Sequence, residues 1–273
     1  MVVLTAASGE TNLVAITEAV VTAGQTRYLV RDKLAPVAAG AGCERVDEPP
    51  AAAAVVCTAG AIGPQQLGDG DDWITSPGGW ASGGDGDDVM TVNFGHADGG
   101  EGNDVLLVDT GEADGEEGDD VLIGGRGAGG SGDDRLMVGS GLGDLGDDIM
   151  SCFPQDSGCY LNGGAGDDVL TGGTGIDRLF GERGRDLVRG GARDDVLDGG
   201  VGNDRLIGGA GLDALGGGAG ADRLEAREDR SAGEKPKKDR VDCGAGRRDQ
   251  ATVDRRDRVK RCERVTRRRD RAG

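Results

Sequence analysis

The sequence is poor in the residues from which a thick globular core is built. Aromatic residues make up only 3% of the 273 residues, and there is a single histidine, His96. No stretch approaches the 18 or more consecutive apolar residues that a membrane-spanning helix needs. Residues 1–66 contain no convincing signal peptide, because they lack a basic segment before a long apolar run. These shortages exclude an interior of packed aromatic rings and a transmembrane helix.

The local signatures of common hydrolases are also missing. Neither H-E-x-x-H nor G-x-S-x-G occurs in the sequence. His96 follows Phe94 without a positioned partner that would make it a catalytic base, so we interpret it as a surface residue. Paired acids such as Asp87 and Asp88 recur along the chain, whereas the carboxylate pair of a glycosidase occurs once. We therefore predict that the protein is not an enzyme.

Glycine, with 55 residues, is abundant and regularly spaced. Residues 163–225 divide without remainder into seven nine-residue units that fit G-G-x-G-x-D-x-U-x, where U is a large apolar residue. Glycine at positions 1, 2 and 4 lets the backbone take positive φ and turn tightly, which exposes carbonyl oxygens. The remaining x-U-x forms a short strand with U pointing inward. One unit is half a coil, so stacked pairs of units predict a solenoid.

The same unit continues towards the N-terminus with a different spacing. Between residues 67 and 151 the units start 14 or 16 residues apart, so each turn contains one complete half and one shortened half. Ten loops then fall on one edge of the solenoid, the first edge, and three on the opposite, second edge. First-edge loops start at residues 67, 83, 99, 115, 129, 143, 163, 181, 199 and 217, and second-edge loops at 172, 190 and 208.

Position 8 of the unit predicts the core. Its thirteen residues are all aliphatic or Met, whereas position 7 varies from Trp73 through valine to arginine, so we expect position 8 to be buried. The residues at position 8 are Ile74, Met90, Leu106, Leu122, Leu136, Met150, Leu170, Leu179, Val188, Leu197, Leu206, Leu215 and Leu224.

Charge is distributed unevenly along the chain. The net charge is -19; residues 226–273 carry 18 Lys+Arg against 10 Asp+Glu, which leaves a net -27 for residues 1–225. Such a dense set of carboxylates repels itself unless cations neutralise it. Low apolar content with high charge also predicts intrinsic disorder. We expect disorder without metal and folding with it, because a permanently disordered chain would have no reason to keep a period.

The six cysteines form three locally spaced pairs, with no zinc-knuckle spacing and no histidine nearby. We interpret them as three disulfides, which indicate an oxidising, extracellular compartment. Six reduced thiols in a cytosolic protein are the alternative. The pairs are Cys43 with Cys57, Cys152 with Cys159, and Cys243 with Cys262.

Both ends of the solenoid are predicted to be capped, because an open end exposes core and unpaired strand edges. In residues 1–66, Thr11–Val21 and Thr26–Val30 have strand composition, with a helix over Leu13–Thr22 as the alternative. Residues 152–162 are predicted to be a disulfide-closed insert. Residues 226–273 comprise a charged connector, 226–240, and a basic cap. In the cap Val241, Val253, Val259 and Val265 recur at strand-like intervals, and its arginines either face solvent or bind polyanions.

These repeats resemble the RTX, or haemolysin-type, calcium-binding family over residues 67–225. The resemblance implies a parallel β-roll, an all-β solenoid in which position-6 carboxylates and loop carbonyls of two stacked turns hold each ion. Ten loops enclose nine gaps and three enclose two, so at most about eleven calcium ions are expected. The implied metal ligands are Asp72, Asp88, Asp104, Asp120, Asp134, Asp148, Asp168, Asp177, Asp186, Asp195, Asp204, Asp213 and Asp222. The pattern is broken by Leu67 at position 1, Glu116, Asp144 and Glu182 at position 2, and Arg193 at position 4.

The resemblance and the residues together predict a secreted calcium-binding repeat protein that folds on binding calcium. It would act as a structural, adhesive or cell-surface module without catalysis. The alternative is the non-catalytic part of a secreted hydrolase or toxin of the RTX type. Calcium is the expected cofactor, nucleic acid is not expected to bind, and a partner on a cell surface or an extracellular polymer is left open.

Overall fold

The computed structural model describes strands at residues 2–5, 13–22, 25–32, 43–47 and 53–58, and continuous chain at 62–76, 78–153, 158–226 and 237–267, with side chains from residue 66 onward. Every regular element in these residues is a β-strand, which confirms the predicted all-β class. The described residues contain no helix of the length and apolarity that crossing a bilayer requires. The chain divides into two compact units, Met1–Gly130 and Ser131–Gly273.

The first unit begins with strands that pair in antiparallel fashion. The strand β2 pairs with β3, and β5 pairs with both β3 and β4. Leu13–Thr22 is therefore a strand, and the helix alternative was wrong. The backbone places Cys43 opposite Cys57, but their side chains lie outside the described part, so that disulfide stays a prediction. The strands are β1 (Val2–Thr5), β2 (Leu13–Thr22), β3 (Gln25–Asp32), β4 (Cys43–Asp47) and β5 (Ala53–Thr58).

The rest of the first unit is a stack of parallel strands. β6 pairs with β8, β8 with the second half of β9, and β9 with β10. Their register aligns position 2 of successive units, Gly68 with Gly84 and Gly84 with Gly100, so sixteen residues make one full turn. β1 and β2 join this stack by parallel pairing with β6 and β7. The strands are β6 (Ile62–Asp69), β7 (Trp73–Ser76), β8 (Gly79–Asp85), β9 (Val89–Glu101), β10 (Val105–Glu117) and β11 (Val121–Ser131).

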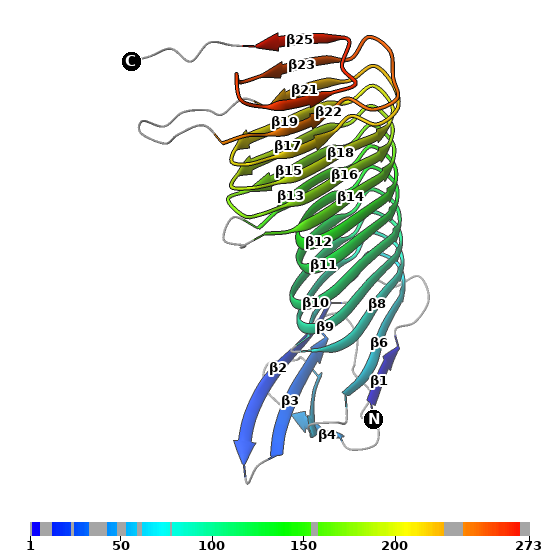
Figure 1. Ribbon diagram of the computed structural model, residues 1–273. Helices are drawn as coiled ribbons and strands as arrows, with labels where there is room; N and C mark the ends of the chain where they lie inside the picture. The colour runs from blue at the N-terminus through cyan, green and yellow to red at the C-terminus, as the bar shows by residue number, and fades with distance from the viewer. Residues whose placement is uncertain are drawn as a thin grey trace. The chain divides into compact units, whose positions relative to one another are not determined.

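The second unit contains two parallel sheets to which each turn contributes one strand. In one sheet the first half of β12 pairs with β13, and each later strand pairs with the one before it in the order β15, β17, β19, β21, β23 and β25 (Figure 1). In the other sheet the second half of β12 pairs with β14, and the order continues with β16, β18, β20, β22 and β24. This alternation is a parallel β-solenoid, as predicted.

The elements of the second unit are short, as expected for x-U-x segments between tight loops. They are β12 (Arg135–Leu145), β13 (Ile149–Cys152), β14 (Tyr160–Ala165), β15 (Val169–Gly173), β16 (Arg178–Arg183), β17 (Leu187–Ala192), β18 (Val196–Val201), β19 (Arg205–Ala210), β20 (Ala214–Gly216), β21 (Arg223–Ala226), β22 (Arg240–Asp242), β23 (Gln250–Val253), β24 (Arg258–Lys260) and β25 (Arg264–Arg267).

The core is the predicted row of position-8 side chains. All thirteen are at most 2% exposed, whereas Trp73, at position 7, is 51% exposed. Burying one such aliphatic side chain contributes roughly 1.5–3 kcal/mol. The shortened halves of the first unit turn small residues inward, such as Ala81, Ala97 and Ala113. The interior is therefore filled although aromatic residues are scarce.

Two segments differ from their predicted description. The insert at 152–162 is partly built into the solenoid, because Tyr160 begins β14 and Leu161 is fully buried. The C-terminal cap continues both sheets, but Val265, which was expected at a strand-like interval, is 39% exposed. In β23 the residue after Gln250, Ala251, is buried. The pattern of large apolar residues at regular intervals did not predict this position, because alanine is small.

Candidate metal centre

The loops take the tight conformation that their glycines predict, with one correction. Gly84 at position 2 and Gly86 at position 4 have φ of 113° and 128°, in the left-handed region that favours glycine. No position-1 glycine in the described residues has a φ in that region. Our expectation of positive φ at position 1 was therefore wrong, and another cause selects glycine there.

That cause is a cradle of oxygen atoms beside position 1. A Cβ added to Gly99 would collide with Oδ2 of Asp104 in its own loop and would lie 2.7 Å from the carbonyl oxygen of Gly115 in the next turn. Gly181 has the same surroundings, formed by Asp186 and the carbonyl of Gly199. Only glycine leaves open the space between a position-6 carboxylate and the carbonyl of the following loop.

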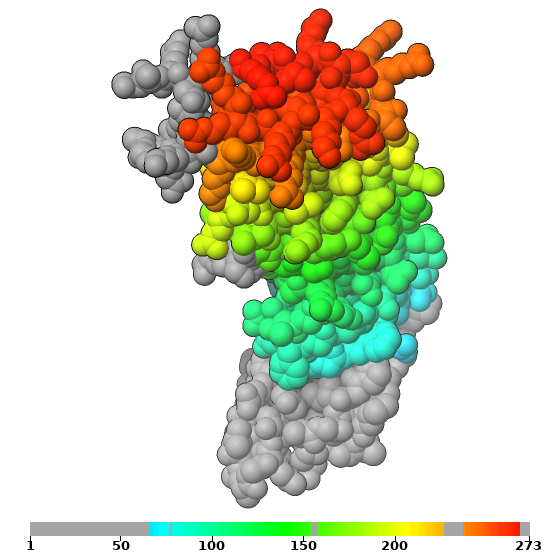
Figure 2. Space-filling view, in the orientation of Figure 1, coloured from blue at the N-terminus to red at the C-terminus, as the bar shows by residue number. Residues whose placement is uncertain are grey.

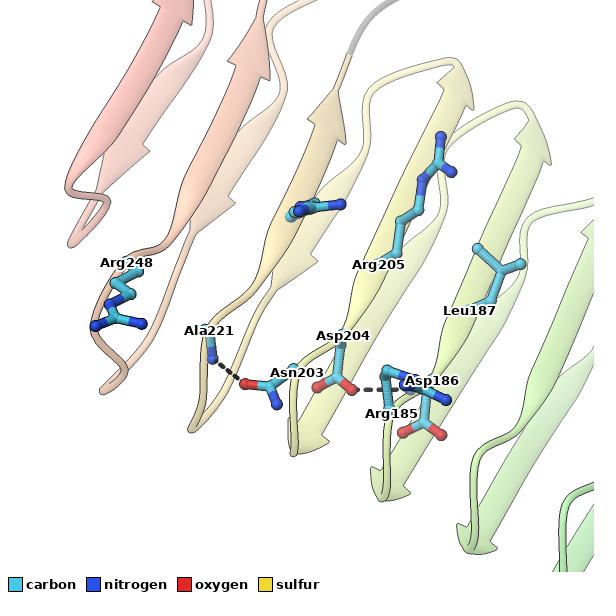
Figure 3. A pocket seen from close by; sticks show the side chains of 9 residues that line it. Arg185, Asp186, Leu187, Asn203, Asp204, Arg205, Ala221 and Arg248 are labelled. Carbon is cyan, nitrogen blue, oxygen red and sulfur yellow. Dashed lines mark hydrogen bonds between the residues drawn. The ribbon is translucent and has the colours of Figure 1, made fainter.

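Oδ1 of the position-6 aspartates is used for stacking within each unit. The backbone N–H of Asp88 donates to Oδ1 of Asp104 at 2.7 Å, and Asp186 N–H donates to Oδ1 of Asp204 at 3.0 Å (Figure 3). On the second edge, Asp177 N–H donates to Asp195 at 2.9 Å. We call this series of hydrogen bonds the position-6 ladder. It fixes each carboxylate between two turns, with one oxygen committed to the preceding turn.

The second oxygen of these carboxylates is buried without compensation. Among the described residues, Oδ2 has no hydrogen-bond partner in eight of the predicted ligands: Asp88, Asp104, Asp148, Asp168, Asp186, Asp195, Asp204 and Asp222. Each of these residues is at most 1% exposed. An unpartnered buried carboxylate oxygen is costly unless a proton or a cation satisfies it.

The electrostatics of the ladder favour the protonated form in the absence of cations. Burial raises the pKa of Asp168 to about 8, although the N–H donated by Asp148 lowers it; the charges of Asp148 and Asp186 raise it further. Burial likewise raises the pKa of Asp88 and Asp104 to about 7. The loops therefore hold a surplus of negative charge that only protons or metal ions can balance.

A second ladder runs along the outside of the first edge. Oδ1 of Asp87 at position 5 accepts the N–H of Asn103 in the next turn at 2.8 Å, and Oδ1 of Asn203 accepts the N–H of Ala221 at 2.8 Å (Figure 3). These position-5 hydrogen bonds lie at the solvent-exposed surface. Their side chains accept from the following turn, whereas position-6 side chains accept from the preceding one, so each loop is tied in both directions.

The substitutions at glycine positions keep the loop conformation. Glu116, Asp144 and Glu182 at position 2 have φ of 77°, 72° and 73°, and Arg193 at position 4 has a φ of 76°. Such values are strained for residues with a Cβ. The stacked neighbours thus impose the conformation that the sequence itself opposes.

The predicted ligands are brought together within each unit. The first unit contains one series of hydrogen-bonded position-6 aspartates, Asp72, Asp88, Asp104 and Asp120. The other nine predicted ligands lie in the second unit. There Asp134, Asp148, Asp168, Asp186, Asp204 and Asp222 are successive on the first edge. Asp177, Asp195 and Asp213 are successive on the second edge. All thirteen are buried.

Comparison with known families agrees with this geometry. The family model described as "RTX calcium-binding nonapeptide repeat (4 copies)" matches residues 114–141, 162–192 and 189–224. Within residues 114–224 the chain carries RTX calcium-binding nonapeptide repeats. The loops starting at 67, 83 and 99 precede the matched residues, yet they share their strand register with the loop at 115. No curated protein matches the chain significantly.

The RTX pattern did not reveal the acidic residues of the C-terminal cap. Asp249 continues the first edge, because its Oδ1 accepts the N–H of Asp222 at 2.9 Å, and Asp239 continues the second edge by accepting from Asp213 at 2.9 Å. Both are at most 1% exposed. A weak signal was present: Asp239 precedes Arg-Val and Asp249 precedes Gln-Ala, a reduced form of the D-x-U core. Asp239 therefore belongs to the solenoid and not to the predicted connector.

Arginine side chains surround part of the RTX first edge. A groove of about 540 Å³ is lined by Arg185, Arg205, Arg223 and Arg248 together with Asp186 and Asp204 (Figure 3). Arg185 pairs with Asp167 at 2.7 Å and Arg205 with Glu225 at 3.4 Å, both near solvent. Burial nevertheless raises the pKa of Asp186 and of Asp204 to about 6. These guanidinium groups therefore do not replace a cation between the loops.

The cap is basic on its outside. Its lysines and arginines within 237–267 are exposed, and Figure 2 shows long side chains projecting from the orange and red residues. Arg261 Nε donates to Asp242 at 2.6 Å and lowers the pKa of that carboxyl. Charged side chains face solvent, an exposure that both predicted alternatives require.

One further cluster has the composition of a metal site. The sulfurs of Cys152 and Cys159 and a carboxylate oxygen of Asp177 lie within 4.8 Å of one another. The two sulfurs form a disulfide, and Cys159 N–H donates to Oδ1 of Asp177 at 2.9 Å. Cys159 thus occupies the place of position 6 in a loop that would precede the second edge. The disulfide Cys152–Cys159 therefore closes the chain at the start of that edge.

Proposed function

We propose that this protein is a calcium-binding RTX repeat protein whose β-roll forms as calcium occupies the gaps between stacked loops. Oδ2 of successive position-6 aspartates is buried without a hydrogen-bond partner, next to a space that a Cβ at position 1 would fill. A bound cation would satisfy such an oxygen without protonating it.

The donor set fits calcium. Carboxylate and carbonyl oxygens alternate along the gaps, and calcium takes six to eight oxygen ligands with flexible geometry. Within a gap such as that beside Gly99, the residues that would hold the ion are Asp104 and the carbonyl of Gly115. The bound ion supplies positive charge where carboxylates crowd. Asp104 and its counterparts hold the ligand oxygens in place through the position-6 ladder.

We further propose that the protein is extracellular and has a structural, adhesive or cell-surface role without catalysis. The disulfides Cys152–Cys159 and Cys243–Cys262 support an oxidising compartment. Extracellular calcium is abundant enough for weak carbonyl-rich sites to be occupied. The Oδ2 atoms of position-6 aspartates such as Asp104, which have no hydrogen-bond partner among the described residues, support calcium as a partner.

Far-UV circular dichroism tests the proposal. Chelator-treated, oxidised protein is titrated with calcium, and magnesium serves as the control because it demands stricter octahedral geometry. We expect a steep transition from coil to β-structure with calcium alone. A spectrum that is already rich in β-structure and indifferent to chelator would show that calcium does not organise the fold.

A further inference from the structure

The C-terminal cap contains a loop that stacks on the last nonapeptide as one RTX loop stacks on another. Gly217 N–H donates to the carbonyl of Asp242 at 2.8 Å, and Gln250 N–H donates to the carbonyl of Asp222 at 2.8 Å. Asp222 N–H also donates to Oδ1 of Asp249 at 2.9 Å. Residues 243–249 therefore form an eleventh loop on the first edge.

The gap between this loop and the loop at 217–222 contains the same cradle of oxygen atoms as the gaps between nonapeptide loops. A Cβ added to Gly217 would lie 2.6 Å from the carbonyl oxygen of Cys243 and 2.7 Å from Oδ2 of Asp222. One turn earlier, a Cβ on Gly199 would meet Oδ2 of Asp204 and the carbonyl of Gly217 in the same way. The carbonyl of Cys243 thus takes the place of a position-1 glycine carbonyl.

Burial and charge repeat the same pattern. Asp222 and Asp249 have no exposed surface, and Oδ2 of each has no hydrogen-bond partner among the described residues. The loop escapes the repeat pattern because Cys243 replaces glycine and because Arg247 and Arg248 make it one residue longer than G-G-x-G-x-D. It also lies beyond the residues that the family model matches.

We propose that Gly217–Asp222 and Cys243–Asp249 enclose one additional calcium site. The inference rests on the proposed function, since it assigns the same ion to a loop outside the nonapeptides. Oδ2 of Asp222 and the carbonyl of Cys243 are the ligands the cradle presents, and Asp249 supplies a second carboxylate. Cys243 is bonded to Cys262, so this ion joins the last RTX loop to a covalently closed cap.

Gly217→Ala tests the site locally, because its methyl group would enter the cradle while no carboxylate is removed from the sequence. Gly216→Ala is the matched control: its Cβ would lie 3.4 Å from Oδ1 of Asp198, an ordinary contact. Bound calcium ions are counted by native mass spectrometry at saturating calcium. We expect Gly217→Ala to hold one ion fewer than the wild type and Gly216→Ala to hold the same number. An unchanged count in Gly217→Ala overturns the proposal.

A second variant keeps the proposal testable if Gly217→Ala also disrupts the packing of the C-terminal cap. Asp249→Asn keeps an oxygen acceptor for the N–H of Asp222 but removes the charge. A small dithiol reductant is applied with and without calcium, and reduction of each disulfide is followed by alkylation and mass mapping. We expect calcium to slow reduction of Cys243–Cys262 in the wild type by at least severalfold, and Asp249→Asn to lose this protection while Cys152–Cys159 keeps its own.

The two levels of failure can be told apart. If the wild type holds no calcium and neither disulfide responds to it, the proposed function fails. If the wild type holds calcium but Asp249→Asn retains full protection of Cys243–Cys262, the additional site fails and the RTX sites stand.

Discussion

The two edges of the second unit solve the same stacking problem with different side chains. First-edge loops have both ladders, with Asp147 accepting the N–H of Asp167 at position 5. Second-edge loops carry Ile176 and Leu212 at position 5, which are 50% and 41% exposed, and there Asp194 makes a position-5 bond by accepting the N–H of Leu212 at 3.0 Å. Both edges nevertheless bury every position-6 aspartate. The difference teaches that position 6 lies between stacked turns and must be a carboxylate, whereas position 5 lies outside and tolerates apolar residues.

The largest expected effect on folding comes from substitutions at position 8, whose residues are buried in the units of both edges. Leu206 follows a first-edge loop and Leu197 a second-edge loop, and each is at most 1% exposed. Leu206→Asp and Leu197→Asp should each prevent folding at any calcium concentration, because an unpaired buried carboxylate costs several kcal/mol. Circular dichroism at saturating calcium checks this. Arg205→Asp adds the same group at the exposed neighbouring position and should fold; native β-content in either leucine variant would refute the interior assignment.

The next effect compares the ladders directly. Asp204→Ala on the first edge and Asp195→Ala on the second remove a buried carboxylate whose Oδ1 accepts a backbone N–H at 3.0 Å and 2.9 Å. Losing a hydrogen bond to a charged group costs roughly 1.5–3 kcal/mol, so the calcium midpoint of folding should rise about tenfold or more in both variants. Calcium titration monitored by circular dichroism measures it. A midpoint that changes for Asp204→Ala alone would mean that second-edge loops bind no ion.

Acid should partly replace calcium on both edges. Burial raises the pKa of Asp168 to about 8 on the first edge and that of Asp195 to about 7 on the second, from an ordinary value of 3.8. The metal-free folded state therefore binds more protons than the unfolded chain between these values. Its stability should be greatest below about pH 4 and should fall as the pH rises from about 4 to about 8.

Circular dichroism of chelator-treated protein across this pH range measures the effect. With calcium present, protons compete for the same oxygens, so the affinity of the folded protein for calcium, measured by titration calorimetry, should fall as the pH falls through the same range. A metal-free protein whose β-content increases with pH would contradict the burial of these carboxylates.

The smallest expected effect repairs an irregular second-edge loop. Arg193 occupies position 4 with a φ of 76°, where the other edge has glycine. Arg193→Gly should raise the free energy of unfolding by roughly 1 kcal/mol, since it relieves a left-handed residue that carries a Cβ. Denaturant unfolding in saturating calcium measures it. Arg178→Gly, in the strand β16, should instead lower the stability, and equal changes in both variants would argue against strain at Arg193.

Much of the fold was predictable because the unit is short and local. The nine-residue period placed Leu170 and Leu179 inside and alternated the loops between edges, and both predictions are confirmed by burial and strand register. The strands of residues 13–22 and 25–32 followed from their composition. The thirteen position-6 aspartates were found because a carboxylate at a fixed place in a glycine-rich loop is visible in the sequence.

What the period could not predict involves atoms from different turns. The need for glycine at Gly99 comes from Asp104 and from the carbonyl of Gly115, a residue in the next turn. Likewise, the cap's part in the ladder depends on Asp249 meeting Asp222 across 27 residues. The connector at 226–240 and the longer loop at 243–249 separate these two aspartates, so Asp249 does not fall on the nine-residue spacing.

The sequence by itself determined the solenoid, its two edges, its aliphatic interior and the carboxylates between its turns, because each is specified within one unit of nine residues. Only the tertiary structure decided how these carboxylates are used. Stacking commits Oδ1 of Asp222 to the N–H of the preceding turn. It also places Oδ2 of Asp222 and the carbonyl oxygen of Cys243 around the same point beside Gly217, since these two oxygens come from successive coils.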